Sequence, residues 1–526
     1  MRGRSLVASC NALLRCLESA PTSAKCWILN LSRPHSAEVA PQRSYDVAFP
    51  LSDLLQGAGA ATVPALAVEG VNADSRAVGP REVFFALPGT RVHGDDYAAQ
   101  AVARGAVAMV TDRLPDADPG VPVVVVADVR AAYAIAAARQ FAPQPAVSVA
   151  VTGTNGKSSI VSFVRQIWAA CGIPAASLGT IGVETAAGIL PRELTTSDAL
   201  SLHRDLGELK ARGIDHVAME ASSQGLDQRR VDGLRFNAVA FTNLSRDHLD
   251  YHIDMESYRH AKLRLFTDLI AEGGAAVVNC DDPEHMPFLF AALDRGATLL
   301  TVGREGAFLE LTRIENEGYG QRVTGRMVGE PVSFHLPLTG AFQVSNAAVA
   351  LALAVSTGSP ADRAVMALEG LRGAKGRLEL VGEHNGAAIF VDYSHKPVAL
   401  ETALESLRPY ARRRLNLVFG AGGDRDRGKR PIMGQVADRM ADDVIVTDDN
   451  PRTEDPALIR LQILAEASRA REIGDRRQAI ATAISDLQPG DVLLIAGKGH
   501  EDYQIIGQTK HHFSDHEVVL ETIGGR

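Results

Sequence analysis

The chain has 526 residues, of which 46% are hydrophobic, 22% charged and 5% aromatic, and its formal net charge is −9. At about 150 residues per domain this length favours three or four domains, and the negative charge argues against a nucleic-acid-binding protein. No apolar run approaches the roughly 20 residues that a membrane span needs, and the five cysteines follow no metal-binding spacing, which favours reduced thiols in a cytoplasmic protein.

Residues 1–44 have a composition of their own. Glu18 and Glu38 are the only acidic residues there, against six Lys or Arg, and three of the five cysteines lie in this segment. Acid-poor N-termini of this kind occur in organelle transit segments. We favour a mis-assigned start site or a disordered tail instead. Secretion is disfavoured because no apolar segment precedes a small-residue cleavage site.

Residues 45–129 are expected to form a small α/β domain. Residues 83–87 and 123–126 are short apolar runs rich in β-branched or aromatic side chains, which predict strands. The Ala-rich segment 97–105 between them predicts a helix.

Residues 130–374 are expected to form a central α/β domain around a glycine-containing loop. The apolar run 146–151 is typical of a buried strand, and apolar residues recur at helical spacing from Ile160 to Trp168. The loop between this strand and this helix consists of Gly153, Thr154, Asn155, Gly156, Lys157 and Ser158.

A loop of this kind between a strand and a helix is typical of phosphate binding. Its N–H groups and the helix N-terminus attract phosphate oxygens, while Lys157 suits the β- and γ-phosphates of ATP and Ser158 suits Mg²⁺. The full G-x-x-x-x-G-K-[ST] pattern would need glycine at Val151, and the shorter form is less specific. A glycine-rich turn with a solvated lysine is the alternative, and the strand–loop–helix context favours phosphate binding.

Two further polar side chains follow predicted strands of the same domain. Glu220 follows the run 217–219, and His248 lies beyond the run 239–241. The carboxyl ends of parallel strands meet at one edge of a sheet, so both are expected near the loop. A carboxylate there suits Mg²⁺. Composition alone does not select His248 over His252.

Residues 375–526 are expected to form a third α/β domain. Short apolar runs again predict strands between helical segments, at residues 388–391, 416–419, 443–446 and 492–496. Several of them are followed by loops rich in Gly or Asp, at residues 420–428, 447–451 and 497–501. A parallel sheet would place these loops at its C-terminal edge, where ligands bind.

Together these segments resemble the Mur ligase family of peptidoglycan synthesis, from about Leu51 to the C-terminus. Within the family the likeness is greatest to members that add the third peptide residue. The linked motifs follow the family's order: Asp74-Ser75-Arg76, residues 153–158, Thr195-Thr196, residues 220–223 and 242–252, Ala261-Lys262, Gly376-Arg377, and residues 392–395, 422–430, 449–452 and 497–501.

The resemblance implies an α/β fold of three domains in series. Residues 45–129 would bind the UDP substrate, and residues 130–374 would form a central P-loop ATPase-type parallel sheet. Residues 375–526 would form a Rossmann-like domain that closes over both and binds the amino acid. We expect a cytoplasmic monomer that acts in cell wall biogenesis.

The resemblance also implies ligands for individual residues. Ser75 would contact the uridine nucleotide, and the muramoyl-peptide site would be lined by Thr195, Thr196, Ser222, Gln228 and Arg230. Besides the loop, ATP would meet Ser159, with Asn346 facing adenine and Arg377 and Asp392 near the ribose and phosphates.

Two Mg²⁺ would be held by Ser158, Glu220, His248 and Lys262. By its spacing in a predicted helix, residues 258–266, Lys262 would be a surface lysine. It matches the position that family members carbamylate, and an N6-carboxylysine presents a carboxylate to the second metal ion.

Four positions depart from the usual family pattern. Ser158 and Ser159 replace two threonines, Gln224 replaces a histidine, and Gln343 replaces an asparagine. The catalytic candidates Lys157, Glu220, His248 and Lys262 are all present.

The reaction implied by the resemblance is an ATP-dependent amide ligation. The D-Glu γ-carboxylate of UDP-MurNAc-L-Ala-D-Glu would attack the γ-phosphate of ATP, and the amine of the next amino acid would attack the resulting acyl phosphate. Arginine is suited to grip a distal carboxylate, which predicts meso-diaminopimelate as that amino acid. Its site would comprise Arg425, Asp449, Asn450, Pro451, Arg452, Gly497 and Glu501, with Glu501 facing the distal ammonium.

Three other functions remain open from the sequence. An L-lysine-adding ligase would lack the arginine at position 452, as the resemblance implies. A folylpolyglutamate synthase-like enzyme would share the loop and metal residues but would not require Asp-Asn-Pro-Arg. A non-catalytic scaffold would have lost catalytic residues, and we find none lost.

Overall fold

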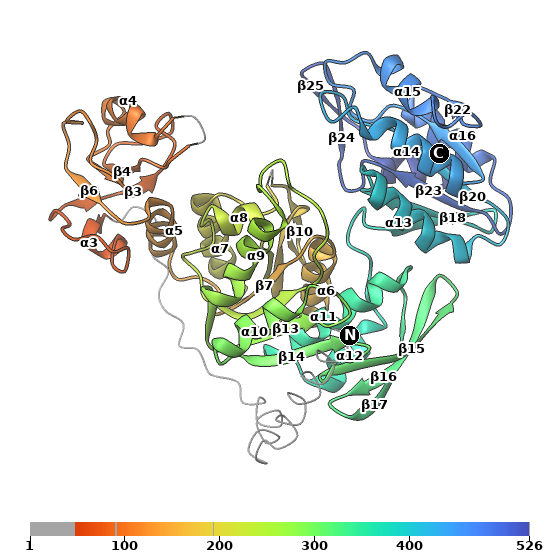
Figure 1. Ribbon diagram of the computed structural model, residues 1–526, viewed down its shortest axis with the longest axis horizontal. Helices are drawn as coiled ribbons and strands as arrows, with labels where there is room; N and C mark the ends of the chain where they lie inside the picture. Colours follow the sequence, from red (N-terminus) through yellow and green to blue (C-terminus); the bar gives the residue numbers. More distant parts are fainter. Residues whose placement is uncertain (1–47, 90–91, 193, 525–526) are drawn as a thin grey trace, which may run out of the picture.

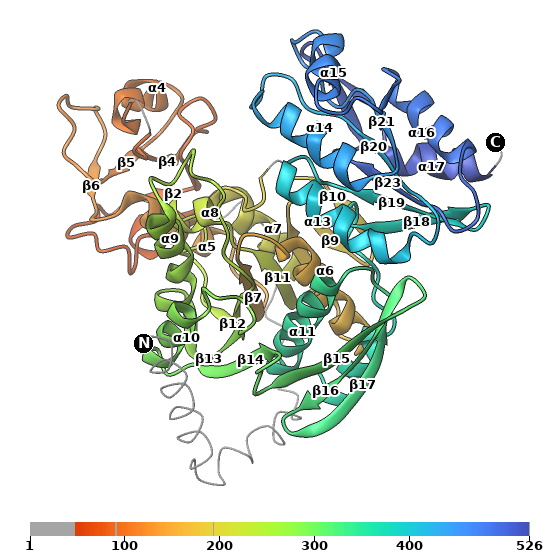
Figure 2. The ribbon, with the colours of Figure 1, turned by 45° about the vertical axis from the view of Figure 1, so that its right-hand side comes forward.

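The computed structural model describes residues 48–89, 92–192 and 194–524, and it contains three α/β parts in series (Figure 1). Figure 2 shows the first and third parts on opposite sides of the central part, as in Figure 1. Residues 1–44, for which we weighed a tail against a transit segment, lie outside the described residues. Within these ranges no helix is long and apolar enough to cross a membrane.

The first part is a four-stranded parallel sheet in the order β3-β4-β5-β6. The predicted strands and helix of this part are confirmed. Its strands are β3 (Gly70–Asn72), β4 (Glu82–Phe85), β5 (Ala108–Thr111) and β6 (Val123–Val125), preceded by the antiparallel pair β1 (Phe49–Pro50) and β2 (Ala67–Val68). Its helices are α3 (Leu51–Leu54), η1 (Gly94–Tyr97), α4 (Ala98–Ala103) and α5 (Val129–Gln140).

Helix α5 packs against this first sheet, although it begins at the predicted domain boundary. The side chain of Asp128 caps it by accepting a hydrogen bond from Ala131 N. Its buried residues, including Ala132 and Tyr133, share one core with strands β3 to β6. The boundaries at 129/130 and 374/375 stay predictions.

The central part is built on an eleven-stranded sheet in the order β10-β9-β8-β11-β7-β12-β13-β14-β15-β16-β17. The parallel strands are β7 (Val147–Thr152), β8 (Ala175–Gly179), β11 (His216–Glu220), β12 (Phe236–Phe241), β13 (Ile270–Asn279) and β14 (Thr298–Gly303). The outer strands are β9 (Gly182–Thr185), β10 (Gly188–Leu190), β15 (Leu309–Glu317), β16 (Gly320–Met327) and β17 (Glu330–Leu336). The strands predicted near 150, 218 and 240 are confirmed, whereas β8 to β10 and β13 to β17 were not predicted.

Helices cover both faces of the parallel strands, which explains their almost continuously apolar sequences. One core contains residues of α6 (Lys157–Ala170), α11 (Ala341–Ser356) and α12 (Ala361–Leu368). The opposite core contains residues of α7 (Ala199–Ala211), α8 (Ser223–Asp227), α9 (Met255–Thr267) and α10 (Met286–Asp294).

The third part is a six-stranded sheet in the order β18-β19-β23-β20-β21-β22, parallel except for β18. The four predicted strands are confirmed. The strands are β18 (Glu379–His384), β19 (Ala387–Asp392), β20 (Leu415–Phe419), β21 (Asp443–Val446), β22 (Arg471–Glu472) and β23 (Val492–Ala496), with a hairpin of β24 (Tyr503–Ile506) and β25 (Thr509–His512). The helices are α13 (Pro397–Leu407), η2 (Arg408–Tyr410), α14 (Lys429–Met440), α15 (Pro456–Leu464), α16 (Arg476–Ser485) and α17 (Asp515–Gly524). The predicted α/β class with a parallel central sheet is confirmed.

Candidate active site

The glycine-containing loop turns sharply between β7 and α6. Gly153 has φ 148° and Gly156 has φ 86°, values that favour glycine. A Cβ at Gly153 would collide with Thr242 Oγ1, and one at Gly156 would collide with Asn346 Oδ1. Both glycines are therefore required by backbone conformation and by close neighbours.

The segment after β12 holds this loop in place. Thr154 N donates to Asn243 O and Asn155 N to Asn243 Oδ1, both at 2.9 Å, while Thr242 Oγ1 donates to Asn155 O at 2.7 Å. These two loop N–H groups are thus already used. The N–H groups at the start of α6 have no partner within the helix, so they are the donors we assign to phosphate.

Lys157 folds back over the loop. Its Nζ donates to Gly153 O at 2.9 Å and to Thr154 O at 2.8 Å. Burial lowers the pKa of Lys157, and the carboxylate of Glu220 opposes that shift. The ammonium lies beside the phosphate-binding turn, where it would neutralise phosphate charge.

Glu220 and Ser158 form an oxygen-rich pair at the end of β11. Ser158 Oγ donates to Glu220 Oε1 at 2.8 Å, and Thr180 N donates to the same oxygen at 2.7 Å. A Cβ on Gly179 would collide with that carboxylate. A hydroxyl and a buried carboxylate beside a phosphate loop fit Mg²⁺, which binds hard oxygen ligands.

Lys262 is not the surface lysine that its spacing suggested. Its side chain is 1% exposed, and Nζ donates to Gly153 O at 2.7 Å and lies 4.5 Å from the centre of the Tyr258 ring. Burial, with a smaller contribution from Lys157, lowers the pKa of Lys262 well below its usual range. A larger fraction of neutral amine favours reaction with carbon dioxide, so the environment fits carbamylation.

The structure distinguishes the two candidate histidines. The His248 side chain is 43% exposed, and its residue adopts φ 55°. His252 is 5% exposed, and its Nε2 is buried without a hydrogen-bond partner among the described residues. Partial burial lowers the pKa of His248, which favours the neutral imidazole that binds metal. Of these two histidines, His248 therefore has the more accessible side chain, and its metal binding stays a prediction.

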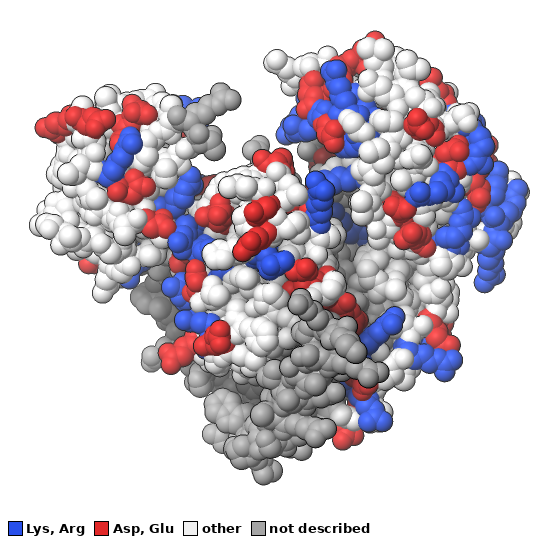
Figure 3. Space-filling model, viewed as in Figure 1, with Lys and Arg blue, Asp and Glu red and all other residues white. Residues whose placement is uncertain are grey.

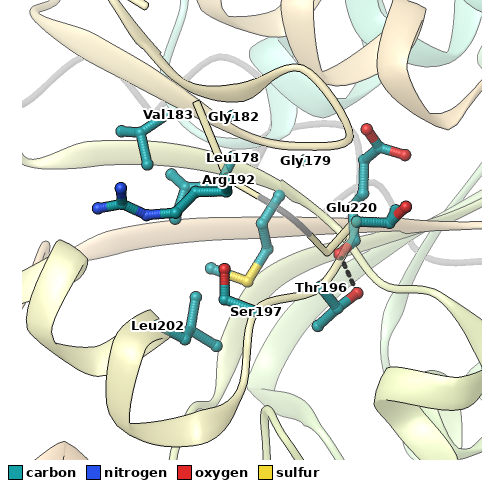
Figure 4. A pocket seen from close by; sticks show the side chains of 11 residues that line it. Leu178, Gly179, Gly182, Val183, Arg192, Thr196, Ser197, Leu202 and Glu220 are labelled. Carbon is teal, nitrogen blue, oxygen red and sulfur yellow. Dashed lines mark hydrogen bonds between the residues drawn. The ribbon is translucent and has the colours of Figure 1, made fainter. Parts of the chain in front are cut away.

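Residues assigned to the muramoyl-peptide site form one hydrogen-bonded network with Glu220, and Figure 4 marks its bond to Thr196. Thr196 Oγ1 donates to Glu220 O at 2.9 Å and lies 3.0 Å from Ser222 Oγ. Thr195 Oγ1 lies 3.0 Å from Thr180 Oγ1. Arg230 Nη1 donates to Thr196 O at 2.7 Å, and Arg230 Nη2 donates to Gln228 Oε1 at 2.7 Å.

Figure 4 shows a small pocket beside this network, with Glu220 and Thr196 on one side and Arg192 on the other. Arg192 Nε donates to Asp205 Oδ2 at 2.9 Å, which anchors the segment that contains the two threonines to α7. Sequence reasoning missed Arg192 because nothing in its local sequence indicates that ion pair.

Ser75 lies apart from these groups, in the turn after β3 of the first part. Its Oγ donates to Gln100 Oε1 at 2.7 Å. In the space-filling view the central part forms the floor of a hollow between the first and third parts (Figure 3).

The residues assigned to ATP come from two parts of the chain. Asn346 of α11 lies against Gly156, and its Nδ2 donates to Gln343 Oε1 at 3.0 Å. The unusual Gln343 is thus a buried partner of Asn346. In the third part the Arg377 guanidinium lies 4.8 Å from the centre of the Tyr393 ring.

Asp392 joins the end of β19 to the segment that enters the third part. It accepts hydrogen bonds from Leu378 N at 2.6 Å and from Ser394 N at 2.8 Å. Burial raises the pKa of Asp392, and its hydrogen bond from the Ser394 side chain opposes that shift. Asp392 therefore fixes the position of Arg377, which precedes Leu378.

Three loops of the third part, which follow β20, β21 and β23, meet at the C-terminal edge of its sheet. Asn450 Nδ2 donates to Glu501 Oε2 at 2.9 Å, and Arg452 Nη1 donates to Gly423 O at 2.8 Å. A Cβ on Gly497 would collide with Asp449 Oδ2. Burial raises the pKa of Glu501.

Arg425 and Pro451 belong to the same cluster of loops. Arg425 is exposed near Arg452, since both side chains flank Gly422. Pro451 lies against Gly423. The predicted amino-acid-binding residues are thus brought together, and their ligands stay predictions.

Comparisons with known proteins agree with this geometry. Three family models match: "Mur ligase family, catalytic domain" at residues 67–141, "Mur ligase middle domain" at residues 151–354, and "Mur ligase, glutamate ligase domain" at residues 376–499. The UDP-N-acetylmuramoyl-L-alanyl-D-glutamate--2,6-diaminopimelate ligase of Bradyrhizobium diazoefficiens is 52% identical over 483 residues, which cover 90% of this chain and 99% of that protein.

Two solved structures extend the comparison. A UDP-N-acetylmuramoyl-L-alanyl-D-glutamate--2,6-diaminopimelate ligase superposes with a TM-score of 0.70 at 32% identity, covering 91% of this chain and 99% of the other. Mycobacterium tuberculosis folylpolyglutamate synthase complexed with ADP has a TM-score of 0.58 at 18% identity, covering 70% and 91%. The second likeness shows a shared fold alone.

Proposed function

The chain belongs to the Mur ligase family, and we propose that it is the ATP-dependent ligase that adds meso-2,6-diaminopimelate to the D-Glu γ-carboxylate of UDP-MurNAc-L-Ala-D-Glu. The observation that carries the proposal is the contact of Ser158 Oγ with Glu220 Oε1 at 2.8 Å, beside Lys157. A phosphate turn, a metal-suited carboxylate and the residues assigned to the muramoyl peptide share one edge of the central sheet.

Cationic side chains lie near the phosphate turn. The charges of Arg377 and Lys396 act on Lys157, together with those of the carboxylates Glu220 and Asp247. Such cations suit a triphosphate and a carboxylate, which would otherwise repel each other. We therefore assign the region to ATP and to the γ-carboxylate that attacks it.

Ser158, Glu220, His248 and Lys262 as its carbamate are the residues that would hold two Mg²⁺. Bound Mg²⁺ would neutralise phosphate charge during transfer. The chemistry of the donor set fits this role, since it offers a hydroxyl, a buried carboxylate, an accessible imidazole and a buried amine with a lowered pKa.

The reaction proceeds in two displacements. A γ-carboxylate oxygen of the substrate attacks the γ-phosphorus of ATP, and the bond to the β-γ bridging oxygen breaks to release ADP. The amine of diaminopimelate then attacks the acyl carbon, phosphate leaves, and the nitrogen loses a proton. Lys157 stabilises negative charge on the transferred phosphoryl group in the first displacement.

The choice of diaminopimelate rests on the three loops of the third part. Diaminopimelate has a carboxylate and an ammonium at its far end, whereas lysine has only the ammonium. Arg452 Nη1 donates one hydrogen bond to Gly423 O, and the remaining N–H groups of the guanidinium are available to a carboxylate. Arg425 would assist it, and Glu501 with Asn450 would meet the distal ammonium.

The deciding experiment measures phosphate release from ATP with UDP-MurNAc-L-Ala-D-Glu and either diaminopimelate or lysine. We expect release with diaminopimelate, much less with lysine, and none without the UDP substrate. Lys157→Ala should lower the rate at least about 100-fold. Equal rates with lysine would support a lysine-adding enzyme, and turnover unaffected in Lys157→Ala would refute the ATP site.

The same assay separates the remaining alternatives. A folylpolyglutamate synthase-like enzyme would ignore the UDP substrate, and a scaffold would hydrolyse no ATP with any substrate. Action in the cytoplasm as a monomer stays part of the proposal.

A further inference from the structure

Lys498 is a fully buried lysine in the loop after β23, with 0% of its side chain exposed. Its Nζ donates to Asn450 Oδ1 at 2.9 Å and to Tyr503 O at 2.6 Å. The ammonium also lies 3.7 Å from Glu501 Oε2. A buried cation is costly without such partners, so these contacts define where the ammonium sits.

Asn450 connects Lys498 to Glu501. Its Oδ1 accepts from Lys498 Nζ and from Ile505 N, both at 2.9 Å, while its Nδ2 donates to Glu501 Oε2 at 2.9 Å. The ammonium can only donate, so it requires the amide oxygen on its own side and leaves the NH₂ group for the carboxylate. Lys498 thereby orients the side chain that positions Glu501.

Lys498 also acts on Glu501 through charge. Burial raises the pKa of Glu501, and among the groups that oppose this shift Lys498 has the largest effect. Burial lowers the pKa of Lys498, which the nearby Asp449 and Glu501 counteract. The other charged or titratable groups acting on these two residues are Arg452, Tyr393, Tyr503, and the buried ion pair Arg476–Asp515.

We propose that Lys498 is a positioning residue for amino-acid selection, which orients Asn450 and holds Glu501 as a carboxylate toward the distal ammonium of the incoming diamino acid. The inference rests on the proposed function of the three loops. It adds a residue that contacts no substrate and acts through Asn450 and Glu501.

The test compares Lys498→Met, Lys498→Arg and wild type in phosphate release, with separate titrations of diaminopimelate and ATP. Lys498→Met is expected to raise the KM for diaminopimelate at least about tenfold, because a hydrogen-bonded charge is lost, and to leave the KM for ATP within about twofold. Lys498→Arg keeps a charged hydrogen-bond donor and should hold the KM for diaminopimelate within about threefold of wild type.

The pH dependence supplies a readout that loss of packing alone would not produce. Without its cation, Glu501 would hold its proton to higher pH. Raising the pH should therefore lower the KM for diaminopimelate more in Lys498→Met than in wild type. The matched control is Lys510→Met, which removes an exposed lysine 4.7 Å from the centre of the Tyr503 ring and should behave as wild type.

An unchanged KM for diaminopimelate in Lys498→Met, equal changes in both KM values, or no rescue by Lys498→Arg would overturn the role of Lys498. If Lys498→Met does not fold, the folded Lys498→Arg variant decides the question. A KM for diaminopimelate within about threefold of the wild-type value supports the role, and a rise of about tenfold refutes it. Wild type that does not use diaminopimelate would instead refute the proposed function.

Discussion

Lys396 of the third part and Asp247 of the central part form an ion pair across the two parts, with Nζ 2.7 Å from Oδ1. Lys396 directly precedes α13, and Asp247 directly precedes His248. The pair therefore joins the third part to the segment that bears a candidate metal ligand. Its side chains are 47% and 24% exposed, so solvent screens it substantially.

Lys396→Met should affect catalysis more than stability. An exposed pair contributes up to about 1 kcal/mol, so denaturant unfolding should shift little. Loss of a cation that acts on Lys157 should lower kcat/KM for ATP about threefold to tenfold at low salt, and less at high salt. Lys210→Met, which breaks the ion pair between Lys210 of α7 and Asp215 just before β11, is the matched control and should leave kcat/KM unchanged. No salt dependence of the difference would contradict the electrostatic role.

Lys262→Arg should lower kcat at least about 100-fold, because arginine cannot form the carbamate and a bound metal ion supplies several kcal/mol. Phosphate release measures the loss, and native mass spectrometry should detect one added carbon dioxide in wild type but not in the variant. Because the pKa of Lys262 is lowered, its neutral fraction grows as pH rises from below that pKa. At a fixed concentration of dissolved carbon dioxide, reactivation of decarbamylated protein should therefore quicken as pH rises toward that pKa, and full activity of Lys262→Arg would exclude this role.

Gly179→Ala should displace Glu220, because the added Cβ would collide with the carboxylate. We expect kcat to fall about 100-fold with a folded protein, through loss of the Ser158–Glu220 oxygen pair. Steady-state phosphate release and circular dichroism measure the two effects. Gly370→Ala is the control, since its Cβ would meet Ala367 O only at 3.7 Å. Equal activity of both variants would show that Glu220 tolerates displacement.

Arg452→Ala should raise the KM for diaminopimelate about 10- to 100-fold, the effect of losing a charged hydrogen-bond donor. The activity with lysine should change little, so the preference for diaminopimelate over lysine should narrow. Arg427→Ala removes an exposed arginine of the neighbouring loop that pairs with Glu454, and it should retain the wild-type preference. If Arg452→Ala lowers the activity with diaminopimelate and with lysine by the same factor, Arg452 does not select between the two amino acids.

Asp515→Ala should destabilise the third part by about 3–5 kcal/mol, because it leaves a buried guanidinium without its partner. Arg476 and Asp515 are both 0% exposed, and Arg476 Nε lies 2.7 Å from Asp515 Oδ1. Denaturant unfolding followed by far-ultraviolet circular dichroism measures the shift. Asp486→Ala, which breaks the surface pair with Arg471, should cost under about 1 kcal/mol. If the two variants lose similar free energies of unfolding, burial does not make the Arg476–Asp515 pair more important than the surface pair.

Local patterns in the sequence determined the elements around the site. The run 146–151, the glycines of the loop and the apolar spacing after Ile160 each depend on near neighbours, and β7 and α6 lie where they predict. Strands β15 to β17 were not predicted from the sequence. Much of β15 and β17 is polar and exposed to solvent, so these strands lack the apolar runs that marked the other strands. The attachment of α5 to the first sheet depended on packing with residues far away in the chain.

The sequence by itself determined the order of the motifs, the presence of Lys157, Glu220 and His248, and hence the family. Only the tertiary structure decided that Lys262 is buried, that His248 rather than His252 is accessible, and that Lys498 reaches Asn450. The physical reason is that parallel strands bring their carboxyl ends together through long crossovers. At that edge, burial and contact involve residues that are distant in the chain, so the local periodicity of the sequence does not indicate them.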